Sequence, residues 1–202
     1  MFCYALSMPR TTSFTSEQLA DRALQHFWIN GFHASSMDDL VKATGVSRHG
    51  IYGSVGGKRA LFLSCFERYQ QSVVTPAFKT VEAPDATVQN VSDYFEWQIS
   101  LGESVGLPGP GCFVANSATE VAPDDPDVMS EVTRHNDRLR QGFVLALKNT
   151  APHIPPQKTH ELADVMVIFT NGLWTKSRTV SDGDVLRKAV QDFLALITDA
   201  LE

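Results

Sequence analysis

Two short stretches of helical pattern meet at the tetrapeptide Thr44–Ser47, which contains a single glycine. The first stretch begins after Ser36, a residue type that favours the helix N-cap, and the second begins directly after the tetrapeptide. Gly45 can adopt the left-handed conformation that ends a helix, and Val46 can pack in the angle between the two helices. With Ile51 as the buried anchor of the second helix, the segment predicts a helix-turn-helix.

Helical spacing of apolar residues continues through most of the chain. The expected helices cover about residues 15–30, 36–44, 48–54, 58–79, 85–103, 112–121, 125–149, 159–177 and 184–201. No stretch alternates with period two, so we predict no strands. The expected fold is all-α: a three-helix helix-turn-helix domain, residues 1–57 with an N-terminal extension, and a larger helical domain, residues 58–202.

Composition is ordinary for a globular protein, but the charges are unevenly divided. The chain has 202 residues with a formal net charge of −6, which by itself argues against a nucleic-acid partner. Residues 1–60, however, carry six Lys or Arg and four Asp or Glu, whereas the remainder carries eleven and nineteen. Binding of a polyanion is therefore expected only at the N-terminal end.

The glycine-rich stretch "GVSRHGIYGSVGGK", Gly45–Lys58, could instead hold the phosphates of a nucleotide. Alignment of the Walker A pattern places Tyr52 at its first glycine and Arg59 at its Ser/Thr position, and no buried strand precedes it. The dinucleotide pattern fails as well, because the glycines are spaced by three. We therefore favour DNA binding over nucleotide binding.

Residues 23–62, "ALQHFWINGFHASSMDDLVKATGVSRHGIYGSVGGKRALF", closely resemble the N-terminal domain of the tetracycline-repressor (TetR) family of transcriptional regulators. The resemblance implies binding to a double-stranded DNA operator, with Arg48 and Tyr52 on phosphates and His49 and Gly50 towards bases. Lys58 is expected to hold a phosphate at the start of the fourth helix. The full candidate set for DNA binding is Ser36, Ser47, Arg48, His49, Gly50, Tyr52, Ser54 and Lys58.

Three positions of this segment leave questions open. Gly50 either permits close approach to DNA or is simply a glycine tolerated in a short helix. Ser54 and Val55 stand where the family usually has an aromatic residue or histidine and a phenylalanine, which removes a phosphate contact and thins the core under the second helix.

The resemblance also implies a helical regulatory domain that binds a small apolar or amphipathic effector. Candidate ligand-binding residues are Phe66, Tyr69, Trp97, Phe113, Asn116, Glu120, Phe143 and Phe169. For Asn116 and Glu120 the alternatives are a polar rim of the pocket and partners for backbone groups of the adjoining loop.

The last two expected helices are apolar enough to bury one stripe on the protomer and another on a second copy. Candidate dimer residues are Leu162, Met166, Phe169, Leu173, Trp174, Leu186, Val190, Phe193 and Ile197. A homodimer would double the contacts of a short reading helix with DNA. The expected protein is a repressor that its effector releases from the operator.

Two alternative functions depend on Cys112. It follows a glycine-rich loop at a helix start, where a thiolate would be favoured, so it could sense oxidants or electrophiles; it could equally be an inert buried side chain. A cysteine-dependent enzyme would need His135 or His153 nearby in space. We expect no enzyme activity, no cofactor and no metal site.

The N-terminus has no pattern typical of a signal peptide or membrane span, so we expect a cytoplasmic protein without a membrane partner. Met8 is a plausible translation start, which would make residues 1–7 an upstream extension.

Overall fold

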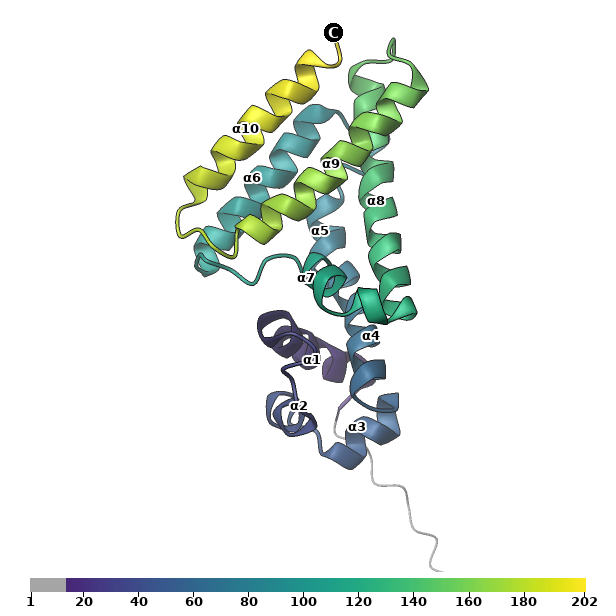
Figure 1. The fold of residues 1–202 in the computed structure, drawn as a ribbon, viewed down its shortest axis with the longest axis vertical. Helices are drawn as coiled ribbons and strands as arrows, with labels where there is room; N and C mark the ends of the chain where they lie inside the picture. Colours follow the sequence, from purple (N-terminus) through teal and green to yellow (C-terminus); the bar gives the residue numbers. More distant parts are fainter. Residues whose placement is uncertain (1–13) are drawn as a thin grey trace, which may run out of the picture.

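The computed structural model describes residues 14–202, and the described residues contain helices and no strands (Figure 1). The expectations about residues 1–7 lie outside the described residues. Figure 1 shows an elongated molecule with a small group of helices at one end and a larger bundle at the other. The all-α prediction is confirmed.

The small group, called the reading head below, consists of helices α1 (Ser16–Asn30), α2 (Met37–Thr44) and α3 (Arg48–Val55). Its local signals act as the sequence predicts. Thr15 and Gln18 form a capping box at the start of α1, and the Ser36 side chain caps α2. Gly45 ends α2 in the left-handed conformation, with φ 71° and ψ 11°.

A single helical rod leaves the reading head and enters the larger bundle. It consists of α4 (Lys58–Tyr69), a π-helical turn η1 (Gln70–Val74) and α5 (Thr75–Phe78), and the backbone stays helical across both junctions. The predicted helix from Lys58 to about residue 79 is confirmed in its extent. The π turn has no signal in the sequence; such turns occur often at functional sites.

The bundle around the rod contains five further α-helices. They are α6 (Val88–Val105), α7 (Phe113–Glu120), α8 (Pro126–Thr150), α9 (Pro156–Lys176) and α10 (Gly183–Asp199), with a 3-10 turn η2 (Ala122–Asp124) before α8. Helices α8 and α9 pack together, α6 packs on α10, and α7 lies between the bundle and the reading head (Figure 1). As predicted, Asp125 caps α8 and Pro126 is its first residue.

Aromatic rings join the cores of the two parts. Phe62 on the rod contacts Phe27 of α1 with 5.1 Å between ring centroids, and Phe113 of α7 at 5.4 Å. Phe32, from the loop after α1, lies 4.8 Å from the same ring. Because one continuous core spans the reading head and the bundle, a shift of α7 or of the rod cannot leave the head unaffected.

Across residues 14–202, none of the helices combines the length and apolar character that crossing a membrane requires.

Candidate nucleic-acid interface and cavity

The N-terminal end of α3 presents the candidate DNA-binding side chains to solvent. Ser47 caps the helix, its hydroxyl oxygen accepting from the backbone N–H of Gly50 at 3.1 Å. Arg48 and His49 are exposed, and Tyr52 is 53% exposed, a high value for a large ring. Ile51 on the opposite side is fully buried, as predicted, so α3 is fixed by its inner face while its outer face stays free.

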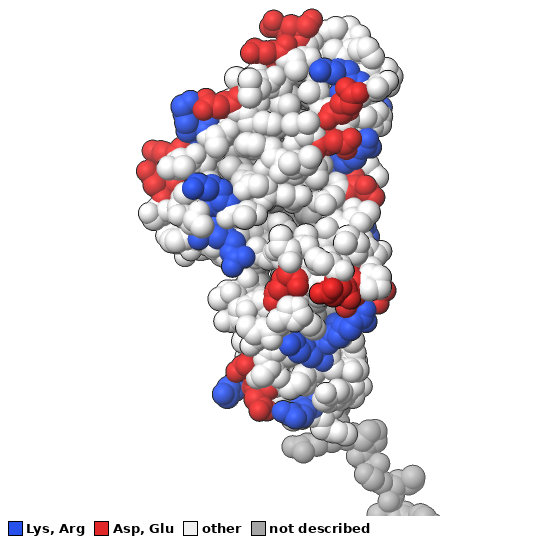
Figure 2. Space-filling model, viewed as in Figure 1, with Lys and Arg blue, Asp and Glu red and all other residues white. Residues whose placement is uncertain are grey.

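Arg48 has an acidic partner on this face. Its guanidinium donates to the Asp38 carboxylate of α2 at 2.9 Å, and both side chains are largely exposed. An exposed pair of this kind contributes little to stability, so a phosphate can replace Asp38 at small cost. Figure 2 shows basic and acidic side chains interspersed at the end of the molecule that carries α2 and α3.

The structure gives Gly50 a role that neither sequence interpretation contained. A Cβ at this position would lie 2.8 Å from Cγ1 of Val46 and 3.3 Å from the Ser47 hydroxyl oxygen. Glycine is therefore required by close packing of α3 on the turn. Gly53 differs, because a Cβ there would meet nothing within 4 Å.

Lys58 begins α4 beside the reading head. Its Nζ lies 4.3 Å from the centre of the Phe32 ring, and partial burial lowers the pKa of its amine, with Glu120 acting in the opposite direction. Ser54 and Val55 are half-buried at the end of α3, and Val55 packs against the core.

Glu120, at the end of α7, clamps the loop that follows α1. Its carboxylate oxygens accept from the backbone N–H groups of Phe32 at 3.0 Å and His33 at 2.8 Å. The fit is close, because a Cβ at Gly31 would lie 2.8 Å from the carboxylate. We call this contact the Glu120 clamp.

Two further contacts lie near the Glu120 clamp, one from the start of the rod and one from the reading head. Arg59 of α4 donates to both carboxylate oxygens of Asp125 at 2.7 and 2.8 Å, and to Asp127 at 2.6 Å. The indole N–H of Trp28 on α1 donates to the backbone carbonyl of Gly111 at 3.0 Å. The head is thus tied to the loop before α7 and to the end of α7, and the start of the rod is tied to the start of α8.

A cavity of about 410 Å³ lies between α1, the rod, α6, α8, α9, α10 and the loop before α7. Its walls include the aromatic side chains of Trp28, Tyr69, Tyr94 and Trp174. None of the described residues that line it is Lys, Arg, Asp or Glu. Because Trp28 and Ile29 of α1 form part of the wall, the reading head itself contributes to the cavity.

His135 of α8 is the least expected member of the wall. It is 4% exposed, and burial together with the nearby Arg138 guanidinium lowers the pKa of its imidazole to about 4. Its Nδ1 lies 2.9 Å from the amide nitrogen of Gln70 in the π turn. The sequence does not indicate that His135 lines a cavity or that Gln70 pairs with it. The two residues are 65 positions apart, and only the tertiary fold brings them together.

Comparison with known proteins decides the family. Residues 19–65 match the family model described as "Bacterial regulatory proteins, tetR family". These residues form a TetR-family domain. The match extends past Gly57 into α4, so it includes the start of the rod.

Two curated proteins are similar to this chain over most of its length. It is 29% identical to the HTH-type transcriptional repressor ComR of Escherichia coli (strain K12), over 94% of this chain and 90% of ComR. It is 28% identical to the HTH-type regulator YezE of Bacillus subtilis (strain 168), over 67% of this chain and 70% of that protein. Both relatives are named as transcriptional regulators.

A solved TetR-family structure shares the fold. A cysteine mutant of the transcriptional regulator CifR, complexed with a 26-bp double-strand operator DNA, matches with a TM-score of 0.78 at 18% identity, over 92% of this chain and 98% of CifR.

Most of the predicted ligand residues lie away from the cavity. Tyr69 lines it. Phe66, Phe113 and Phe143 are fully buried in the core, Trp97 is 49% exposed, and Glu120 forms the clamp described above.

The polar candidate Asn116 binds the loop before α7. Its amide donates to the backbone carbonyl of Pro110 at 2.8 Å, and its side-chain oxygen accepts from Arg178 at 2.9 Å. The geometry of Asn116 is therefore that of the second alternative, a partner for a backbone group of the adjoining loop. Glu120 instead binds backbone N–H groups of the loop after α1, which neither alternative contained.

Cys112 lies at the N-cap of α7, as predicted, and lines the cavity. The Tyr69 hydroxyl donates to its Sγ at 3.4 Å. Burial raises the pKa of the Cys112 thiol despite that hydrogen bond and the backbone N–H groups of α7. No histidine among the described residues hydrogen-bonds to Cys112; His153 binds the carbonyl of Leu201 instead.

The predicted dimer residues fall into two groups. Six are buried within the protomer and therefore pack on its own core: Leu162, Met166, Leu173, Leu186, Val190 and Ile197. Phe169, Trp174 and Phe193 are half-buried. The rings of Phe169 and Phe193 stack with 3.8 Å between centroids and so join α9 to α10.

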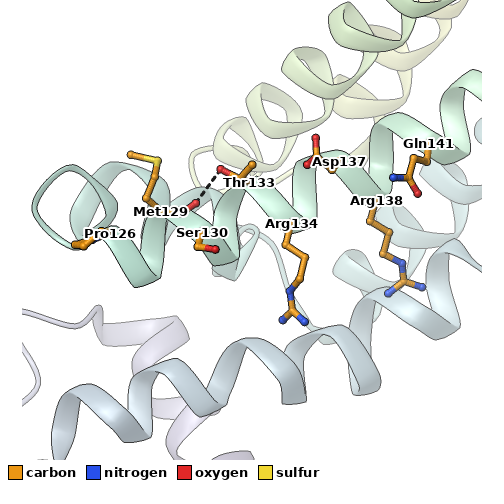
Figure 3. Close-up of a pocket in the computed structure, with 8 residues that line it drawn as sticks. All are labelled: Pro126, Met129, Ser130, Thr133, Arg134, Asp137, Arg138 and Gln141. Atoms are coloured by element: carbon orange, nitrogen blue, oxygen red, sulfur yellow. Dashed lines mark hydrogen bonds between the residues drawn. The ribbon is translucent and has the colours of Figure 1, made fainter.

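A second, shallow hollow follows the outer face of α8. Figure 3 shows that Arg134 and Arg138 extend from α8 towards the rod. Arg134 pairs with Glu67 and Glu131, and Arg138 pairs with Glu82. Both guanidinium groups already pair with acidic side chains, so an anionic ligand in this hollow would have to displace those partners.

Proposed function

We propose that this protein is a homodimeric repressor that an uncharged small molecule releases from its operator. The cavity carries the proposal: it has neutral, largely aromatic walls, and helix α1 of the reading head forms part of them. A ligand that fits the cavity can therefore favour one position of the head over another. The DNA-binding role would place the protein in the cytoplasm.

The exposed face of α3, called the reading face below, supports the DNA-binding part of this proposal. Arg48, His49 and Tyr52 are exposed at the start of α3, while Ile51 anchors the helix from below. In this proposal the DNA-binding domain ends at Gly57, and residues 58–202 form the effector-binding and dimerisation domain.

The residues between the cavity and the Glu120 clamp support the release mechanism. Cys112 both lines the cavity and caps α7, and Glu120 stands at the other end of the same helix. A ligand that displaces Cys112 or Trp28 would move α7, the loop before it, or α1, and so reorient the head. A tenfold preference of the ligand for the DNA-free arrangement corresponds to about 1.4 kcal/mol of coupling.

Exposed apolar residues on α9 and α10 support the homodimer. Ile168 is 72% exposed and Leu196 is 68% exposed, with Val165 and Val185 each 48% exposed. Together with the half-buried, stacked rings of Phe169 and Phe193, these residues give both helices an exposed apolar surface. In this proposal a second copy covers that surface and places two reading heads on neighbouring half-sites.

The experiment is a fluorescence anisotropy titration with the DNA directly upstream of the protein's own gene. Replacement of Arg48 and Tyr52 together by alanine should weaken binding about 100-fold, about tenfold for each side chain that no longer reaches a phosphate. Lys176→Ala, an exposed basic residue at the end of α9, is the matched control and should bind like the wild type. Unchanged affinity of the double variant would exclude α3 as the reading helix.

Thiol-based sensing is a second candidate, favoured by the position of Cys112 in the cavity wall. An electrophile that enters the cavity would meet its Sγ, although burial keeps the group protonated. Under this hypothesis Cys112→Ser abolishes release from DNA by oxidants or electrophiles while operator affinity stays the same. Release of the variant by the same compounds would exclude it.

A further inference from the structure

The orientation of the Gln70 side chain is set by Arg138. The guanidinium has only donors, and it donates to the Gln70 side-chain oxygen at 3.1 Å. Arg138 is itself held by Glu82, to which it donates at 2.6 and 2.8 Å, and by the Thr75 hydroxyl at 3.0 Å. The Gln70 amide therefore directs its nitrogen, not its oxygen, at His135.

This orientation determines which ring nitrogen of His135 carries the proton. The Gln70 amide N–H donates to Nδ1 at 2.9 Å, so Nδ1 must be unprotonated. A neutral imidazole has one N–H, which then lies on Nε2. Nε2 makes no hydrogen bond to any of residues 14–202, although His135 is 4% exposed and lines the cavity. Among the described residues the only fully buried side-chain atom without a partner is His26 Nε2, so His135 Nε2 is not sealed in the core. Its N–H is a donor in the cavity wall that a ligand can pair.

Three neighbouring donors of the wall do not offer the same opportunity. The Tyr69 hydroxyl donates to Cys112, the Trp28 indole to Gly111, and the Thr170 hydroxyl to the carbonyl of Met166 at 2.7 Å. Their protons are thus already used within the protein, whereas the His135 proton is not.

We propose that the cavity binds an uncharged aromatic compound that carries a hydrogen-bond acceptor, a ring nitrogen or a carbonyl oxygen, and that His135 Nε2–H donates to this acceptor. The inference rests on the proposed function only in taking the cavity as the effector site. Gln70 and Arg138 are positioning residues, because they fix the tautomer without lining the cavity. The four aromatic side chains of the wall hold the ring system.

The test compares two probes of nearly equal shape, quinoline and naphthalene, by equilibrium dialysis against the full chain at pH 7 without DNA. Quinoline has one ring nitrogen where naphthalene has a C–H group, and it is uncharged at this pH. One hydrogen bond from a buried donor should make quinoline bind about tenfold more tightly. The anion 2-naphthoate should bind more weakly than naphthalene, because no cation in the described wall compensates its charge.

His135→Phe should remove the preference for quinoline and leave naphthalene binding within about twofold. His160→Phe, the same substitution at a histidine outside the cavity, should keep the preference. Equal binding of the two probes to the wild type, no binding of either, or a preference that survives His135→Phe would each overturn the proposal.

A second measurement does not depend on any variant folding. In histidine labelled with ¹⁵N, long-range ¹H–¹⁵N correlations distinguish a protonated Nε2 from a protonated Nδ1. His135 should show the Nε2–H tautomer, and quinoline should shift its Nε2 resonance. A protonated Nδ1 would overturn the proposal. Because neither experiment uses DNA, their failure is separable from failure of operator binding.

Discussion

The two parts of the helical rod, residues 58–78, lie in different electrostatic environments. At the N-terminal end, the half-exposed Arg59 binds Asp125 and Asp127, and the exposed Arg48–Asp38 pair lies on the nearby reading face. At the C-terminal end, Gln70 holds a buried neutral histidine beside a cavity whose described lining has no charged residue.

The difference shows what each end can recognise. Exposed charges suit a polyanion, because phosphates can replace their present partners at little cost. A neutral, buried wall excludes ions and selects by shape and by single hydrogen bonds. The rod joins these two environments, so the following predictions test whether its ends are as different as the structure indicates.

The largest effect is expected at the Glu120 clamp. Glu120→Ala leaves the backbone N–H groups of Phe32 and His33 without their carboxylate, and should lower the free energy of unfolding by roughly 3 kcal/mol in urea titrations. Glu120→Gln keeps one acceptor oxygen and should fall between the alanine variant and the wild type. If Glu120→Ala is as stable as the wild type, the clamp does not hold the head.

The buried His135 should make the free energy of unfolding depend on pH. Because the pKa of His135 is lowered to about 4 from an ordinary value of 6.5, the unfolded chain binds the proton more readily than the folded one. Stability is therefore full above pH 6.5 and is lost as pH falls towards 4. When the pH falls from 7 to 5, the low proton affinity of folded His135 should lower the free energy of unfolding of the wild type by roughly 2 kcal/mol.

The comparison is with His135→Gln, which cannot titrate and should lose less stability over the same range. His160→Gln serves as control, because this half-buried histidine lies outside the cavity. Identical pH dependence of the wild type and His135→Gln would mean that His135 is not held neutral.

The two glycines of α3 should respond in opposite directions to alanine. Gly53→Ala meets nothing within 4 Å and should raise the free energy of unfolding by about 1 kcal/mol, since alanine favours helix. Gly50→Ala brings a Cβ to 2.8 Å from Val46 and should lower it by about 1 kcal/mol. Stabilisation by both substitutions, measured in urea, would show that the turn has room for a Cβ.

The smallest effect concerns Asp38. Asp38→Asn frees Arg48 and removes a negative charge from the reading face, so operator affinity should rise about two- to fivefold at low salt. The gain should shrink as salt increases, and Asp199→Asn at the far end of α10 should show none. A loss of affinity in Asp38→Asn would mean that Asp38 orients Arg48 for DNA.

Much of the fold was predictable because its signals are local. Ser36, Gly45, Asp125 and Pro126 act within one turn of their own positions, and each ends or begins a helix as expected. The reading face follows from the same signals, since Ile51 fixes which side of α3 is buried.

The cavity was not predictable in the same way. Aromatic residues at helical spacing are equally suited to a core and to a cavity wall, and Phe66, Phe113 and Phe143 proved to be core. Likewise, helical periodicity identifies the apolar stripes of α9 and α10 but does not say which stripe faces the protomer. Leu162 and Ile197 face inward, whereas Ile168 and Leu196 remain exposed.

The sequence by itself therefore determined the helices, their caps, the turn between α2 and α3 and the likeness to a DNA-binding family. Only the tertiary structure decided that Glu120 clamps the head, that Gly50 is needed beside Val46, and that Gln70 and Arg138 fix the proton of His135. The physical reason is distance along the chain. Caps and turns are set by neighbours within a few residues, whereas a cavity is lined by helices whose contacts form only when the whole chain packs.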